Sequence, residues 1–250
     1  MIEEQFSVGD SWIHGLDPRV KIIVAVLFSV TVALSWKFVV LFSSLALSIL
    51  LIAFSRIPIR KALHRLLLVN GFILFLWLFL PLSYSGEAWF SIGPLSVTKA
   101  GILYAGRITI KCNAILITMI ALLATTPVFT LGNAMKKICF PDKLVNLFLF
   151  TYRYIYVIFQ EYRRLLNAMK IRAFRPGTNI HTYRSYAYLV GMLLVKSYDR
   201  AESIHKAMLC RGFNGTYYTL SQFSIKPGDI FYLLFMLATI LGLITLQWII

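Results

Sequence analysis

The sequence contains few acidic residues, with ten Asp and Glu against 25 Lys and Arg, for a net charge of +15. Its three cysteines, Cys112, Cys139 and Cys210, have no paired spacing, which argues against a disulfide framework or a zinc site. The chain has no Walker-type glycine loop, so it is not expected to bind ATP itself. No metalloprotease spacing links its histidines. We therefore predict no catalytic residue, cofactor or metal site.

Hydrophobic residues, in contrast, make up 59% of the chain, and only 14% of residues are charged. These values lie outside the range of soluble domains, so lipid is the expected solvent. A membrane-crossing helix needs about 20 mainly apolar residues, and about 17 suffice. Five apolar runs come near this length: Val20–Ser35, Phe38–Phe54, Leu66–Leu82, Gly106–Thr126 and Ile230–Ile250. None contains Asp or Glu, which argues against a carrier with an ionisable group at mid-membrane.

The joins between these runs suggest local geometry. The first two runs meet at Trp36-Lys37, which predicts a tight hairpin. Arg107 and Lys111 lie in the fourth run, so its start is less distinct, and we expect a break in the helix near Gly101 and Gly106.

Basic residues favour the cytoplasmic side of a membrane. The 56–65 loop carries four of them and the 127–143 segment three, whereas the only charge in the 83–98 loop is Glu87. If 144–160 also crossed, the ten basic residues between Glu161 and Phe213 would face outward. We therefore place Leu144–Gln160 inside a cytoplasmic module, with the N-terminus inside and the C-terminus outside.

Apolar residues recur at steps of three and four from Leu144 to Met169 and again from Tyr186 to Met208. This spacing predicts two long amphipathic helices joined by Phe174–Thr182, with Glu202 and Lys206 as an i,i+4 pair. The predicted fold is an all-α integral membrane protein with about five transmembrane helices and a cytoplasmic helical module. We divide it into residues 1–126, 127–228 and 229–250.

A short sequence motif occurs twice, as Asn167–Phe174 and Lys206–Phe213, at an offset of 39 residues. The shared positions are Ala168/Ala207, Met169/Met208, Arg172/Arg211 and Phe174/Phe213. An arginine at a helix end can merely complement the helix dipole, for about 0.3–1 kcal/mol. Two matching copies favour instead a pair of guanidinium groups that dock on carboxylates or helix-end carbonyls of a partner.

The cluster of basic residues in this region has two other functional interpretations. Attraction to anionic membrane lipid is worth about 1 kcal/mol per Lys or Arg near the surface, and we expect such lipid contact. Nucleic-acid binding is not expected, because the basic residues lie on membrane-associated amphipathic helices.

Several motifs together are typical of one family. They are Asp10-Ser11 with His14, Leu16-Asp17-Pro18-Arg19-Val20-Lys21, Thr125-Thr126-Pro127, Arg175-Pro176, and the run from Ser197 to Phe213. With them, nearly the whole chain resembles the transmembrane T component of energy-coupling factor (ECF) transporters, and most closely the cobalt-type, CbiQ-like members.

The resemblance implies two Ala-Arg-Gly-like motifs at the ends of coupling helices, each engaging one of two ABC-type ATPase subunits. Here they fall on Ile171-Arg172-Ala173 and Cys210-Arg211-Gly212, the first departing from the pattern on both sides of its arginine. The resemblance also implies a multi-pass protein of the cell (inner) membrane and a separate membrane S component that captures the substrate. That substrate is cobalt for this type, with nickel or a vitamin as alternatives.

Three hypotheses therefore stand beside one another. The first is the non-catalytic coupling subunit of an ECF-type importer. The second is a membrane enzyme acting on a lipid or isoprenoid head group, against which the lack of an acidic cluster for Mg²⁺ argues. The third is a plain membrane anchor or assembly factor.

Overall fold

The computed structural model describes residues 11–83, 88–92, 95–138, 140–215 and 226–249. The chain divides into two compact units. One contains α6 (Asp142–Ile171) and α7 (Ile180–Cys210) and is called the two-helix unit. The other, called the membrane unit, contains α1 to α5, a β-hairpin and α8. Each unit is described by itself.

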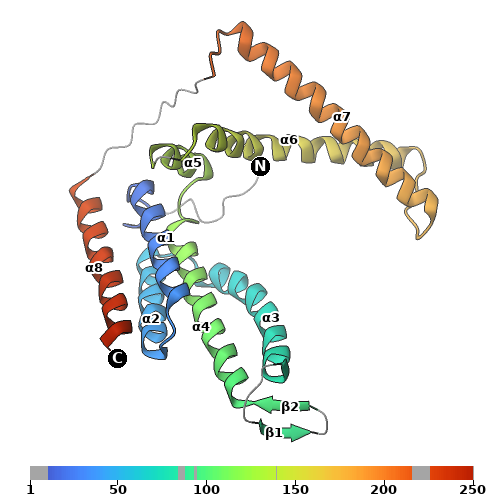
Figure 1. Cartoon of the computed structure of the whole chain (residues 1–250). Helices are drawn as coiled ribbons and strands as arrows, with labels where there is room; N and C mark the ends of the chain where they lie inside the picture. The colour runs from blue at the N-terminus through green and yellow to red at the C-terminus, as the bar shows by residue number, and fades with distance from the viewer. Residues whose placement is uncertain (1–10, 84–87, 93–94, 139, 216–225, 250) are drawn as a thin grey trace. The chain divides into compact units, whose positions relative to one another are not determined.

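The membrane unit is built almost entirely from helices (Figure 1). Its elements are α1 (Pro18–Leu34), α2 (Phe38–Ser55), α3 (Ile59–Ser83), β1 (Ala88–Ile92), β2 (Leu95–Thr98), α4 (Lys99–Leu122), α5 (Val128–Lys137) and α8 (Pro227–Ile249). The helix α5 belongs to this unit, whereas the sequence division grouped it with residues 127–228. Which segments lie outside the bilayer stays a prediction.

Four described helices, α2, α3, α4 and α8, are long and apolar enough to cross a membrane. They coincide with four of the five predicted spans and confirm the all-α membrane class. The first predicted span corresponds to α1, which has 17 residues and is about 25 Å long. That is somewhat shorter than the hydrocarbon core of about 30 Å. The hairpin predicted at Trp36-Lys37 is confirmed, since α1 ends at Leu34 and α2 begins at Phe38.

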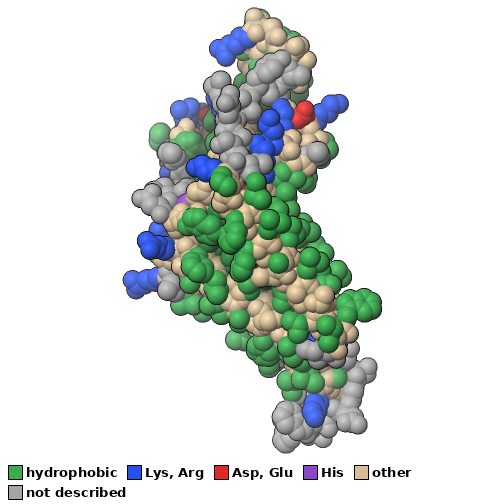
Figure 2. Space-filling view, turned by 90° about the vertical axis from the view of Figure 1, so that its left-hand side faces the viewer, with side chains coloured by type: hydrophobic (Ala, Val, Ile, Leu, Met, Phe, Trp, Pro, Cys, Tyr) green, Lys and Arg blue, Asp and Glu red, His purple; other side chains and the backbone are tan. Residues whose placement is uncertain are grey.

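The core of the membrane unit lies where α1 packs against α4 and α8, and where α2 packs against α4. Its buried side chains are mainly aliphatic, among them Val24, Phe28, Leu41, Leu122 and Met236. The outward faces are also apolar, and Figure 2 shows hydrophobic side chains covering the side of the unit on which α8 lies. A helix bundle that is apolar both inside and outside is what a lipid solvent requires.

Polar contacts attach α3 to α4. The side-chain amides of Asn70 and Asn113 exchange two hydrogen bonds of 3.1 and 3.0 Å. Farther along the same pair of helices, Trp77 Nε1 donates to Thr109 Oγ1 at 2.9 Å. Within a membrane such bonds contribute on the order of 1 kcal/mol each. They fix the register between two helices that share only one face.

The break expected near Gly101 and Gly106 is wrong, because α4 runs without interruption from Lys99 to Leu122. Gly101 has a different role. A Cβ at this position would lie 2.7 Å from Pro81 Cα and 2.9 Å from the carbonyl oxygen of Leu80. The glycine therefore permits a close approach of the first turn of α4 to the last turn of α3.

Two short antiparallel strands, β1 and β2, connect α3 to α4 and were not predicted from the sequence. Their register pairs Ile92 with Leu95 and Ala88 with Thr98. Because the hairpin leads directly into α4, it brings the start of that helix next to the end of α3, where Thr98 Oγ1 donates to the carbonyl of Pro81 at 3.3 Å.

The two-helix unit agrees with the predicted pair of long amphipathic helices. The helices α6 and α7 have 30 and 31 residues and are joined by residues 172–179. The predicted i,i+4 pair is confirmed, with Lys206 Nζ 2.8 Å from a carboxylate oxygen of Glu202. Figure 1 shows α6 and α7 together near their connection and apart at their far ends.

We predict that Gly101→Ala destabilises the membrane unit by about 1–3 kcal/mol, the usual cost of overpacking, because backbone atoms of α3 cannot yield to the added methyl group. Thermal unfolding of the detergent-solubilised protein measures this change. Gly106→Ala is the matched control on the same helix, since nothing lies within 4 Å of the Cβ it would add. Equal stability of the two variants would contradict the close approach of α3 and α4.

Candidate docking site at the ends of two long helices

The repeated sequence motif lies at the C-terminal ends of α6 and α7. Arg172 is the residue that caps α6, and Arg211 is the residue that caps α7. Both side chains are exposed. Among the residues that the structure describes, neither guanidinium group has a hydrogen bond, an ion pair or a ring contact. Both side chains are therefore accessible at the surface of the two-helix unit.

The end of α6 is a Schellman motif, in which the chain reverses and satisfies the last carbonyl groups of the helix. The backbone N–H of Phe174 donates to the carbonyl of Met169 at 3.1 Å. The N–H of Ala173 donates to the carbonyl of Lys170 at 3.0 Å. The reversal turns the chain away immediately after Arg172, so this arginine lies at the tip of the helix.

The end of α7 repeats the same bonds at the equivalent positions. Phe213 N–H donates to the carbonyl of Met208 at 3.0 Å, and Gly212 N–H donates to that of Leu209 at 2.9 Å. The duplicated sequence is thus a duplicated helix end, with the same backbone path around each arginine. This likeness is what a pair of similar receptors would require.

The residue after each arginine adopts a left-handed conformation, with φ of 57° at Ala173 and 76° at Gly212. Glycine takes this conformation without cost, whereas a residue with a Cβ loses about 1–2 kcal/mol. The motif therefore needs glycine at its third position for a backbone reason. The alanine of the first copy makes the end of α6 the more strained of the two.

Phe174 anchors the first helix end against the start of α7. Its ring makes an edge-to-face contact with Tyr186 at a centroid distance of 5.8 Å and lies 6.3 Å from the ring of His181. Because Phe174 follows Arg172 by two residues, this packing fixes the first arginine near the N-terminal end of α7. Arg211 lies at the other end of α7, which is about 46 Å long.

Glu161 joins the middle of the two helices. Its carboxylate, which is largely enclosed, pairs with Lys196 of α7, and Arg164 Nη1 lies 3.5 Å from it. The hydrogen bond from Lys196 holds the pKa of Glu161 below its usual value, helped by the charges of Lys196, Arg164 and Arg200. A lowered carboxylate pKa means that the pairing stabilises the unit at neutral pH and is lost only as pH falls through that lowered value.

An apolar groove of about 270 Å³ runs between α6 and α7 beside this ion pair. Its lining residues include Phe150, Tyr154, Ile158, Ala201 and Ile204, and Glu161 and Lys196 also border it. Within the described ranges, no group of three His, Cys, Asp or Glu side chains could hold a metal ion. The predicted absence of catalytic and metal-binding residues stays a prediction.

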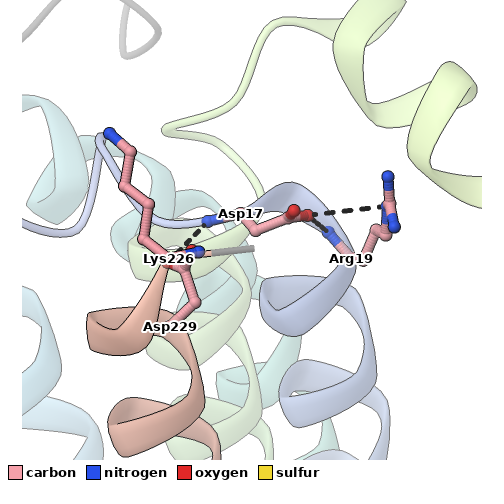
Figure 3. Close-up of polar contacts among 4 residues, drawn as sticks. All are labelled: Asp17, Arg19, Lys226 and Asp229. Carbon is pink, nitrogen blue, oxygen red and sulfur yellow. Dashed lines mark hydrogen bonds and ion pairs between the residues drawn. The ribbon is translucent and has the colours of Figure 1, made fainter. Parts of the chain in front are cut away.

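A second constellation lies at one end of the membrane unit, where two of the quoted motifs, Leu16–Lys21 and Thr125–Pro127, meet. We call Asp17, Lys21, Thr126 and Asp229 the first-turn cluster. Lys21 is 1% exposed, and its ammonium donates to Thr126 Oγ1 at 3.0 Å. Asp229 accepts the backbone N–H of Asp17 at 3.1 Å, and Arg19 pairs with Asp17 beside it (Figure 3).

Three members of this cluster, Asp17, Lys21 and Thr126, belong to the quoted family motifs, but their sequence pattern predicted no role for them. One signal could have indicated that role, namely a lysine within an apolar helix, which must find buried partners. Asp229 had no such signal, because it lies more than 200 residues from Asp17 and only the fold brings the two together.

The fold and these features define a multi-pass membrane protein that carries a separate pair of long amphipathic helices with matching arginine-tipped ends. The profile of the CbiQ family, described as cobalt transport protein, matches residues 9–222. The chain belongs to this family. It is a family of membrane transport components rather than of enzymes.

Relatives support the same assignment. The chain is 29% identical over 227 residues to the energy-coupling factor transporter transmembrane protein EcfT of Bacillus subtilis, covering 86% of this chain and 85% of the relative. It is 26% identical to EcfT of Leuconostoc gelidum, covering 84% and 82%. It is also 24% identical to an uncharacterized protein of Methanocaldococcus jannaschii, covering 93% and 82%.

We predict that Ala173→Gly and Gly212→Ala change the two helix ends in opposite directions. The first removes left-handed strain and stabilises the end of α6, and the second introduces it and destabilises the end of α7, each by about 1 kcal/mol. Hydrogen exchange of the Phe174 and Phe213 amides should slow and quicken by about five-fold, respectively. Shifts in the same direction would contradict the shared cap geometry.

Proposed function

We propose that this chain is the transmembrane coupling subunit, the T component, of an ECF-type importer. It would transmit ATP-driven motion from two ABC-type ATPase subunits to a separate membrane S component that captures the substrate. The observation that carries the proposal is the pair of helix ends with matching cap hydrogen bonds, each with an exposed arginine at its tip. Family membership supports it, because the relatives are named as transmembrane proteins of such transporters.

The chemistry of docking follows from arginine. Its planar guanidinium group donates in a fixed fork that fits a carboxylate or a pair of helix-end carbonyls. Lysine has no such fork. The chain reversal after Arg172 and Arg211 keeps each guanidinium clear of the following residues, so that a groove on an ATPase subunit can receive it. The sites proposed to dock are Ile171-Arg172-Ala173 and Cys210-Arg211-Gly212.

Separation of the two tips suits two receptors. Because α7 is about 46 Å long and Phe174 packs at its start, Arg172 and Arg211 lie far enough apart to engage different subunits. The Glu161–Lys196 pair ties α6 to α7 between them. When the ATPase subunits move on binding ATP, the two helix ends would be displaced together. The two-helix unit would then move as a whole.

Cobalt is the proposed cargo, because the matching family is described as cobalt transport protein. The EcfT relatives are named without a cargo. Nickel is the chemically nearest alternative. Uptake of radioactive Co²⁺ and Ni²⁺ by cells that express the complete complex, each in competition with the other ion, separates the two.

We predict that Arg172→Ala and Arg211→Ala each weaken association with the ATPase subunits by at least about 30-fold, the effect of losing an interface hot spot worth about 2 kcal/mol. The double variant should lose ATP-driven uptake while it still inserts in the membrane. Co-purification with tagged ATPase subunits and metal uptake at matched expression measure the two effects.

The control for these variants is Arg163→Ala with Arg184→Ala. It removes the same number of positive charges from the same two-helix unit, but these arginines lie against Phe159 and Tyr188 rather than at the C-terminal helix ends. Attraction to anionic lipid alone would make both double variants equally defective. Normal uptake by the Arg172/Arg211 double variant would overturn the proposed function.

The proposal also requires both helix ends on the cytoplasmic side, and the exposed Cys210 beside Arg211 offers a test. With Cys112 and Cys139 replaced by alanine, we predict that a membrane-impermeant maleimide labels Cys210 only after cells are permeabilised. Lys37→Cys, at the turn between α1 and α2, is the control expected to react in intact cells. Labelling of Cys210 from outside intact cells would reverse the topology.

A further inference from the structure

Two chain connections join the membrane unit to the two-helix unit. The first leaves through α5 and residues 138–141 into α6. The second returns from the end of α7 to α8, which begins at Pro227. A displacement of α6 and α7 can therefore enter the membrane unit through α5 and through the start of α8. The residues that hold these two segments within the membrane unit decide where the displacement goes next.

The start of α5 is held through Thr126, which is followed by Pro127, the residue that caps that helix. Thr126 is buried, and its hydroxyl oxygen accepts a hydrogen bond from Lys21 Nζ at 3.0 Å. The same ammonium reaches the carbonyl of His14 at 3.4 Å. A lysine on α1 thus binds the corner between α4 and α5 to the loop before α1.

The start of α8 is held through Asp229, which is also buried. One carboxylate oxygen accepts the N–H of Lys226, at the residue before α8, at 2.8 Å, and so caps the helix from within its first turn. The other accepts the N–H of Asp17 at 3.1 Å, as Figure 3 shows. One side chain therefore both starts α8 and binds it to the residue that caps α1.

Asp17 and Lys21 belong to one turn of one helix. Asp17 is the N-cap of α1 and accepts the N–H of Arg19 at 2.9 Å, and Lys21 follows one turn later. The first turn of α1 is thus the common anchor for the beginnings of α5 and α8. Below it, α1 packs through Val20 and Val24 into the core shared with α4 and α8.

Burial of this polar cluster is costly, and a well-packed apolar cluster would hold the same helices at least as firmly. A hydrogen bond requires a defined geometry, and it is replaced by another bond in a single step. Hydrogen bonds therefore hold the helices in one of a few distinct arrangements and give the contact a direction. A joint made of such bonds can transmit a displacement instead of absorbing it.

We propose that the first turn of α1, from Asp17 to Lys21, is the joint through which motion of α5 and of the start of α8 reaches the other helices of the membrane unit. Lys21, Thr126 and Asp229 are positioning residues that act through this joint and touch neither nucleotide nor cargo. The inference rests on the proposed function and adds to it the path of coupling inside the membrane unit.

The experiment compares two adjacent threonines in the complete complex. Thr125 and Thr126 are both buried. Among the described residues, Thr125 Oγ1 donates to the carbonyls of Ala121 and Leu122 at the end of α4, whereas Thr126 accepts from Lys21 of α1. Thr126→Val removes the link to α1, Thr125→Val is the matched control, and Thr126→Ser keeps the hydroxyl. Co-purification of ATPase subunits, ATP hydrolysis and uptake of radioactive Co²⁺ are measured for each.

We expect Thr126→Val to keep the ATPase subunits and to hydrolyse ATP within about two-fold of the wild type, while its Co²⁺ uptake falls at least about ten-fold. Lys21→Met should behave in the same way. Thr125→Val and Thr126→Ser should transport as the wild type does. Hydrolysis that continues without transport is a readout that a merely structural role would not give.

Three results would overturn the inference. One is wild-type uptake by Thr126→Val. Another is a loss of uptake that only parallels lost insertion or lost ATPase subunits, and the third is an equal loss in Thr125→Val. A wild-type protein that neither binds ATPase subunits nor supports ATP-driven uptake would instead overturn the proposed function, and the joint with it.

Discussion

The reversal of the chain in a left-handed residue immediately after Arg172 and again after Arg211 is the constraint on which the rest depends. A helix must satisfy its last carbonyl groups, and here the two backbone N–H groups after each arginine do so. The requirement is local and does not involve a partner. Its consequence is that each arginine caps its helix with its side chain exposed. The hydrogen bonds that a helix end requires thus produce the proposed docking site.

The same reasoning separates the two copies. Gly212 fits the left-handed position, whereas Ala173 adopts it at a cost. Something must hold the first copy in place, and the contact of Phe174 with Tyr186 is suited to that, because it fixes the chain just beyond the strained residue. The first helix end is therefore stabilised by tertiary packing, and the second by its own sequence.

In the membrane unit, polar groups act where apolar packing gives no direction. The exchanged amides of Asn70 and Asn113 set the register of α3 on α4. The first-turn cluster gathers the beginnings of α5 and α8 at α1. Side chains in lipid pack well in many registers, and hydrogen bonds choose among them. The proposed joint uses the same property to carry motion.

The sequence predicted the helices well where periodicity or apolar length extends over many residues. Four predicted spans and both amphipathic helices have counterparts in the structure. It predicted the start of α4 badly, because Gly101 and Arg107 suggest an interruption when each is considered alone. The close approach of Pro81 gives the glycine its role, and that contact depends on two segments about 20 residues apart.

For the candidate site, the sequence by itself determined that two arginines stand at equivalent positions on two helices, because a repeat is visible without coordinates. Tertiary structure alone decided that Phe174 packs against Tyr186 at the first helix end and that Asp229 meets Asp17. Helix periodicity and apolar length are local properties written along the chain. Meetings between distant residues are not, because the packing of the whole bundle selects them.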